Sequence, residues 1–161
     1  QKHFSRERYS IWYLGAAGHN APVFGEYGQE EDWDYTASLN VIQPGLIQCD
    51  LSNAYPEKAG VKHFLRTLDF NSDRVIISDE FELKESLPVN ITLFSVPKPE
   101  ILSGNRVRLG NVIMILDGLS VKETAEMPEL KLRFGELLWG GSLTAIRLTG
   151  TGSGYRLMFQ K

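Results

Sequence analysis

The chain has 161 residues, of which 42% are hydrophobic and 23% charged, which suits one globular domain with a sizeable core and excludes two ordinary domains. Its formal net charge of −3 provides no general attraction to nucleic acid or to anionic lipid, and we expect neither as a partner. The single cysteine, Cys49, excludes an internal disulfide and a zinc site built on several cysteines, and its apolar neighbours predict a buried strand thiol. No stretch is long and apolar enough to span a membrane.

An aromatic segment begins the chain. Residues 9–14 have the sequence YSIWYL, which predicts a short strand that glycines at 15 and 18 end, and a second extended run begins at residues 21–24. Between the two runs lies the sequence Gly18-His19-Asn20. A histidine and an asparagine at the mouth of a strand are a candidate metal ligand, substrate contact or turn cap, and composition leaves all three open.

The rest of the sequence predicts one strand after another. Apolar alternation or β-branched residues mark residues 34–42, 46–51, 61–70, 74–79, 80–83, 89–96, 101–102, 106–109, 111–117, 119–126, 130–134, 142–148 and 155–160. Short turn sequences at 71–73, 103–105 and the Gly-rich 150–154 predict three hairpins. Only residues 122–132 suggest a helix, and Pro128 near their middle opposes it. We therefore predict a single all-β domain over residues 1–161, an antiparallel β-sandwich of about a dozen strands with little or no helix.

Few other residues carry recognisable chemistry. Besides His19 the chain has two histidines, His3 and His63, and no pair of thiolates, so by itself it offers a poor zinc site, because zinc takes about four ligands. His63 is expected to share a strand face with residues 61 and 65, and Arg66 to pair with a carboxylate. The acidic run 30–34 has oxygen ligands that suit calcium but lacks the spacing of a calcium loop, and a solvated loop is the alternative. We assign no catalytic residue within the chain.

Several landmarks occur in an order that resembles one family. The pattern S-R-x-R-Y-x-x-W-Y-x-x-x-x-x-H-N runs from Ser5 to Asn20, and Gly28-Gln29, the sequence DLSNAYP (50–56), Arg66-Thr67 and VIISD (75–79) follow it. Together they resemble the heparinase II/III type of polysaccharide lyase, most closely the heparinase III kind. The resemblance covers most of the first eighty residues and is loose after that.

The resemblance implies the carboxy-terminal β-sandwich portion of a lyase that cleaves uronate-containing glycans of the heparin or heparan sulfate type by β-elimination. It implies a divalent metal in the full-length enzyme, zinc rather than calcium, with His19 as one ligand and the other ligands, an H-x-H segment and an aspartate, upstream of Gln1. The residues that it implies as contacts to the acidic polysaccharide are Arg6, Arg8, Tyr9 and Asn20.

In lyases of this type the catalytic groups lie on an N-terminal helical toroid and on the first part of the β-region. Nothing in this chain matches the toroid, so the resemblance implies a missing helical partner domain, a fragment that is inactive alone, and a periplasmic or secreted protein. Two other classes stay open. One is a non-catalytic carbohydrate-binding module, in which Trp12 or Trp33 stacks on sugars. The other is a structural β-domain that binds neither glycan nor metal.

Overall fold

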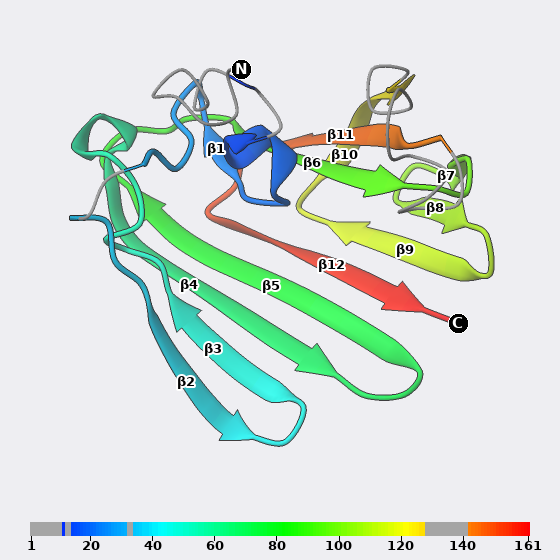
Figure 1. Cartoon of the computed structure of the whole chain (residues 1–161), viewed down its shortest axis with the longest axis horizontal. Coiled ribbons are helices and arrows are strands. Elements are labelled where there is room, and N and C mark those ends of the chain that lie inside the picture. The colour runs from blue at the N-terminus through cyan, green and yellow to red at the C-terminus, as the bar shows by residue number, and fades with distance from the viewer. Residues whose placement is uncertain (1–10, 12–13, 32–33, 128–141) are drawn as a thin grey trace.

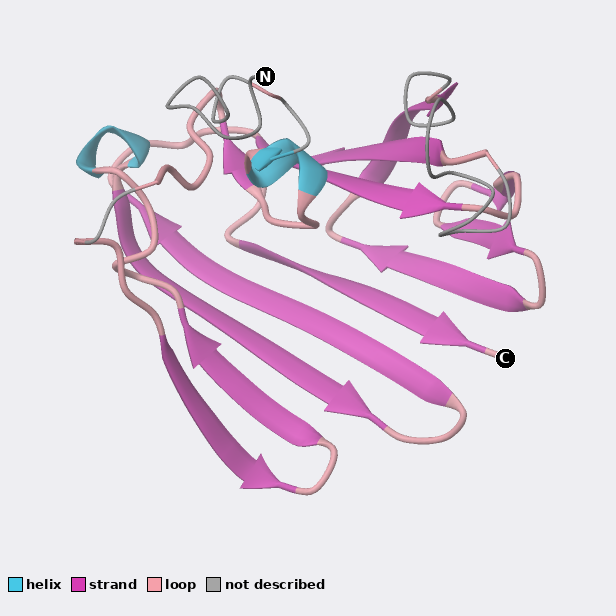
Figure 2. Ribbon diagram, viewed as in Figure 1, coloured by secondary structure: helices cyan, strands magenta, loops and turns pink. Residues whose placement is uncertain are grey.

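The computed structural model describes residues 11, 14–31, 34–127 and 142–161, and this part of the chain is built almost entirely of antiparallel strands (Figure 1). Twelve strands among the described residues form one sheet of eight strands and one of four. The predicted all-β class and antiparallel sandwich are confirmed. Figure 2 shows that helix in the described ranges is confined to short 3₁₀ turns, such as η4 (Ala16–Gly18) and η5 (Glu57–Ala59). None of the helices in the described residues has the length and hydrophobicity that a membrane crossing requires.

The larger sheet has the strand order β2-β3-β4-β5-β12-β9-β8-β7. In that order its strands are β2 (Ser38–Gln43), β3 (Leu46–Asp50), β4 (Val61–Phe70), β5 (Arg74–Leu83), β12 (Gly154–Gln160), β9 (Val112–Asp117), β8 (Arg106–Leu109) and β7 (Glu100–Ser103). The predicted hairpins across 71–73 and 103–105 are confirmed, because β4 pairs with β5 and β7 pairs with β8.

The smaller sheet has the strand order β1-β6-β11-β10. Its strands are β1 (Val23–Phe24), β6 (Val89–Ser95), β11 (Thr144–Gly150) and β10 (Ser120–Glu126). In β6 every second side chain is buried, beginning with Val89, because successive side chains of a strand point to opposite faces. This buried face packs onto the larger sheet and forms one contiguous hydrophobic core with it.

Aromatic rings fill the end of the core nearest β1. The Phe24 ring of β1 lies 4.9 Å from Phe81, 5.1 Å from Tyr55 and 5.9 Å from Phe64, measured between ring centroids. Ring pairs at these separations in tilted or edge-to-face geometry each stabilise a core beyond the area that they bury. The cluster therefore fixes β1 against the larger sheet, and with it the loop that precedes β1.

The smaller sheet covers only part of the larger one. In Figure 1 the hairpin of β2 and β3 and the distal parts of β4 and β5 stand clear of the smaller sheet. Apolar side chains on this part are exposed, from 67% for Leu39 and 61% for Val41 to 41% for Phe70 and 40% for Val75. The free thiol of Cys49 on β3 is only partly buried for the same reason, so the prediction of a buried strand thiol is wrong in degree.

The predicted hairpin over 150–154 is wrong. β11 pairs with β6 and β10 in the smaller sheet, whereas β12 pairs with β5 and β9 in the larger one, so residues 150–154 cross between the sheets (Figure 1). Glycine is needed here for close approach. A Cβ atom would lie 2.3 Å from the Gly118 carbonyl oxygen at Gly150, and 2.5 Å from the Asp79 carbonyl oxygen at Gly154.

Three further predictions differ from the structure or lie outside it. Of the predicted strand 9–14, the described residues Ile11 and Leu14 form a turn, because the Leu14 N–H donates to the Ile11 carbonyl over 2.9 Å. Of the weak helix candidate 122–132, residues 122–126 belong to strand β10. The predicted strand 130–134 lies outside the described residues.

Candidate functional site

The loop over residues 14–22 carries the two predicted site residues that the structure describes, His19 and Asn20. It turns through η4, where the N–H of Gly18 donates to the Gly15 carbonyl over 2.9 Å and that of His19 donates to Ala16 over 3.1 Å. Asn20 then has a φ of +54°, a left-handed conformation that asparagine tolerates better than most residues. Both side chains, the His19 imidazole and the Asn20 amide, are exposed.

Two residues of the larger sheet and its loops hold this segment in place. The buried Tyr55 hydroxyl, from the loop between β3 and β4, donates to the Pro22 carbonyl over 2.8 Å. The guanidinium of Arg66 on β4 donates from Nη1 to the Asn20 carbonyl over 3.5 Å, a long hydrogen bond. The exposed pair His19-Asn20 therefore lies on a loop whose backbone is tied to the sheet beneath it.

Arg66 belongs to a polar cluster that crosses three strands. Arg66 on β4 is directly opposite Asp79 on β5, and Asp79 is directly opposite Tyr155 on β12. The guanidinium donates to both carboxylate oxygens of Asp79, from Nε and from Nη2, each over 2.7 Å. Nη2 also donates to the Tyr155 hydroxyl over 3.2 Å. The prediction that Arg66 pairs with a carboxylate is confirmed, and the pair is a bidentate one.

The cluster is largely buried, and burial together with the Arg66–Asp79 contact shifts the pKa values of Arg66 and Tyr155. The Asp79 residue is 1% exposed and the Arg66 side chain 17% exposed. Burial acts to lower the pKa of Arg66, but the hydrogen bonds and negative charge of Asp79 outweigh it, and the pKa rises above its ordinary value. Burial, and then the Asp79 charge, raise the pKa of the Tyr155 phenol. The cluster therefore consists of an ion pair beside a phenol that is neutral at neutral pH.

The structure does not describe the other predicted site residues. Arg6, Arg8, Tyr9 and His3 lie outside the described residues. His63 is exposed on β4, and a register shift between Val61 and His63 separates their faces, so the predicted shared face is wrong for Val61. Within the described ranges, no three histidine, cysteine, aspartate or glutamate side chains cluster as a metal site would require.

The acidic run 30–34 contributes an ion pair. Glu30 lies 2.5 Å from the Lys58 ammonium group, and both side chains are largely exposed. A carboxylate engaged with lysine on a solvated surface fits the loop interpretation better than a calcium site, which takes six to eight oxygen ligands. Asp32 and Trp33 lie outside the described residues.

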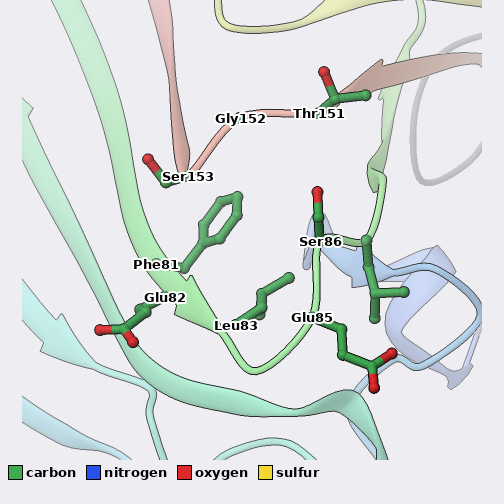
Figure 3. A pocket seen from close by; sticks show the side chains of 9 residues that line it. Phe81, Glu82, Leu83, Glu85, Ser86, Thr151, Gly152 and Ser153 are labelled. Carbon is green, nitrogen blue, oxygen red and sulfur yellow. The ribbon is translucent and has the colours of Figure 1, made fainter.

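A hollow of about 430 Å³ lies between the loop after β5 and the crossover 150–154. Figure 3 shows the Phe81 ring pointing into it, the Ser86 hydroxyl beside it, and the carboxylates of Glu82 and Glu85 pointing away. Glu82 is engaged with Lys62, which lies 2.6 Å away. None of the described residues that line it is an arginine or a lysine, so this part of the surface does not suit an anionic sugar.

Comparison of the sequence with models of protein families found no match, and comparison with curated proteins found none either.

Proposed function

We propose that the chain is the carboxy-terminal β-sandwich portion of a heparinase II/III-like polysaccharide lyase, acting by β-elimination on uronate-containing glycans of the heparin or heparan sulfate type. The observation that carries the proposal is the sequence from Ser5 to Asn20, which ends in an exposed histidine and asparagine on an anchored loop. An exposed loop held from below suits a wall of a substrate cleft, because it presents side chains without moving.

The chemistry of β-elimination supports assigning catalysis to another part of the enzyme. The reaction needs a base for the C5 proton of the uronate, a group that neutralises its carboxylate, and an acid for the leaving oxygen. Arg66 is already paired with Asp79, and the raised pKa of Tyr155 keeps its phenol protonated. In the proposal these groups shape the wall, and the catalytic residues belong to a helical domain outside this chain.

His19 is proposed as one ligand of a divalent metal, zinc rather than calcium. The described residues alone do not fit such an ion, because they bring no further histidine, cysteine or carboxylate cluster to the loop. In the proposal the remaining ligands come from the part of the enzyme that precedes Gln1. A bound zinc ion would supply positive charge at the cleft, and the role of this chain is to present one imidazole on a fixed loop.

Glycan binding by the isolated chain tests the assignment of the wall. We expect heparan sulfate to bind weakly, and the double variant Arg6→Ala/Arg8→Ala to reduce the affinity by about tenfold or more, because each arginine supplies a charge-assisted contact to sulfate or carboxylate. Arg108→Ala is the matched control, since Arg108 lies on β8 and pairs with Glu100. Calorimetric titration at two salt concentrations measures the effect.

Asn20→Gly tests the loop itself. Glycine accepts the φ of +54° without strain, so we expect the variant to fold as stably as the parent while losing the side-chain amide and part of its heparan sulfate affinity. Unchanged heparan sulfate affinity in both the arginine and the Asn20 variants would contradict the assignment of this loop to a wall of the substrate cleft. Binding of neutral glycans that Trp33→Ala abolishes would favour a carbohydrate-binding module instead, and a chain that binds no glycan and no metal would favour a structural domain.

A further inference from the structure

Part of the inner face of the larger sheet has no partner among the residues that the structure describes. The register places Phe70 opposite Val75, Val75 opposite Phe159, and Ile47 opposite Val41, all on the face that carries the buried Phe64. Leu39 and Val41 on β2 and Phe70 and Val75 beyond the smaller sheet are 40–67% exposed. We call this surface, formed by Leu39, Val41, Ile47, Phe70, Val75 and Phe159, the open face. It continues the core onto the surface and ends at a hollow of about 140 Å³ beside Val75 and Phe159.

The edge strand beside the open face is unprotected. Natural sheets protect their edges with charged residues, proline, bulges or short strands. β7, the opposite edge of the same sheet, has four residues and a Glu100–Arg108 ion pair, and β10, an edge of the smaller sheet, carries Lys122 and two glutamates. β2 has six exposed residues and no charge, and residues 38–49 as a whole contain no Asp, Glu, Lys or Arg. Of these three edge strands in the described part of the chain, β2 therefore has the fewest features that protect a sheet edge.

We propose that the open face is the self-association surface of the protein, on which a second copy of this chain packs with its own open face about a two-fold axis. A two-fold interface places each residue near its own counterpart or a close neighbour, so a charged patch meets like charge. The charge-free hairpin of β2 and β3 avoids that repulsion, and desolvating it leaves no ion unpaired. Two sheets packed in this way lie about 10 Å apart, the spacing of a β-sandwich, and the copies bury Leu39, Val41, Phe70 and Val75 together.

The size of the surface predicts a weak dimer. Four strands about 4.8 Å apart and about six residues long form a face of roughly 400 Å² in projection. Two such faces together bury about 800 Å², which is less than the roughly 1,200–2,000 Å² of stable complexes and in the range of weak, transient ones, so we expect a reversible dimer that forms as the concentration rises and not a permanent one. The proposal is independent of the lyase assignment, and its failure would leave that assignment untouched.

Sedimentation velocity over a concentration series tests the proposal. We expect the parent chain to shift from monomer to dimer, and Val41→Glu to remain monomeric throughout, because symmetry places the buried carboxylate in the interface twice. Asn40→Lys is the matched control. Its position is next to Val41 on the same exposed strand but on the opposite face, so face-to-face packing tolerates it. Circular dichroism and a melting curve check that both variants fold.

Cys49 provides an independent readout without any substitution. It is the single cysteine, its position faces the same side as Leu39, and it is partly exposed. We expect its reaction with a thiol reagent to slow as the dimer forms. A monomer at all attainable concentrations, or a dimer that Val41→Glu leaves intact, would overturn the proposal. A dimer that Asn40→Lys disrupts as strongly as Val41→Glu would also overturn it and would indicate edge-to-edge pairing of β2 in its place.

Discussion

At the scale of single residues, the polar cluster beneath the 14–22 loop is the feature that connects the core to the candidate site. Asp79 holds Arg66 with two short hydrogen bonds, and Arg66 in turn reaches the backbone of Asn20. Buried ion pairs add little net stability compared with apolar residues of the same shape, but breaking one leaves a charge without compensation. The largest effect of the cluster on stability is therefore expected when one partner of the ion pair is removed.

Asp79→Asn should destabilise the protein strongly. The substitution removes the charge that balances Arg66, and we expect the free energy of unfolding to fall by about 3 kcal/mol, the lower end of the range for broken buried pairs, because the Arg66 side chain is 17% exposed and reaches some water. Urea unfolding measures the change. Glu82→Gln is the control, since Glu82 pairs with Lys62 on the surface, and its effect should be much smaller. Equal effects of the two variants would show that the cluster is not buried as described.

The buried tyrosines predict a loss of stability at alkaline pH. Burial raises the pKa of Tyr155 and of Tyr55, so the folded state keeps protons that the unfolded state releases near pH 10. The stabilisation is complete below about pH 10, and above it the free energy of unfolding falls by about 1.4 kcal/mol per pH unit for each tyrosine.

Tyr155→Phe removes one of these two contributions. Below about pH 10 the variant should be less stable than the parent, because Arg66 loses a hydrogen-bond partner, and the difference should shrink as the pH rises further. Urea unfolding between about pH 8 and pH 11 measures the difference. A difference that does not change with pH would contradict the burial of the phenol.

The sequence predicted part of this cluster. The strand sequence predicts that Arg66 pairs with a carboxylate, as it does in the structure. Its partner was not identified, although Arg66 lies four residues before Phe70 and Asp79 four residues after Val75, the pair nearest the hairpin turn. Tyr155 could not have been found in this way, because β12 joins the cluster from a distant part of the sequence and local patterns carry no information on such pairing.

At the scale of elements, the strands themselves were predictable and their partners less so. Alternation along residues 89–95 and turn residues at 71–73 are local signals, and both predictions are confirmed. The segment 150–154 has the same glycine-rich composition as a hairpin tip but crosses between the sheets. Its glycines serve close backbone approach at both ends of the crossing, which composition does not distinguish from turn formation.

Substitutions along the crossing separate the two uses of glycine. In Gly154→Ala the new Cβ would lie 2.5 Å from the Asp79 carbonyl oxygen, so β5 and β12 must move apart, and we expect a loss of about 2 kcal/mol or more. Gly152→Ala is the control, because its nearest neighbour would be at 3.5 Å, an ordinary contact. Thermal and urea unfolding compare the two. A hairpin tip at 150–154 would instead make both substitutions equally mild.

At the scale of the whole molecule, the unequal sizes of the sheets organise the surface. The smaller sheet covers one end of the larger sheet, and at this end the aromatic cluster around Phe24 and the hydrogen bond from Tyr55 of the larger sheet's β3–β4 loop anchor the 14–22 loop. The other end leaves the open face exposed. The proposed glycan wall and the proposed self-association surface therefore belong to different parts of the same sandwich, and each can be disabled by substitution without the other.

In the proposed function, the His19-Asn20 loop completes a reaction centre whose other residues lie outside this chain. The most direct test is the ultraviolet absorbance of unsaturated uronate released from heparan sulfate, measured with the product of the complete gene, with its His19→Ala variant, and with residues 1–161 alone. We predict turnover by the complete product, a large loss in the His19→Ala variant, and none by residues 1–161. Appreciable turnover by residues 1–161, or an active complete product that His19→Ala leaves unchanged, would contradict the account.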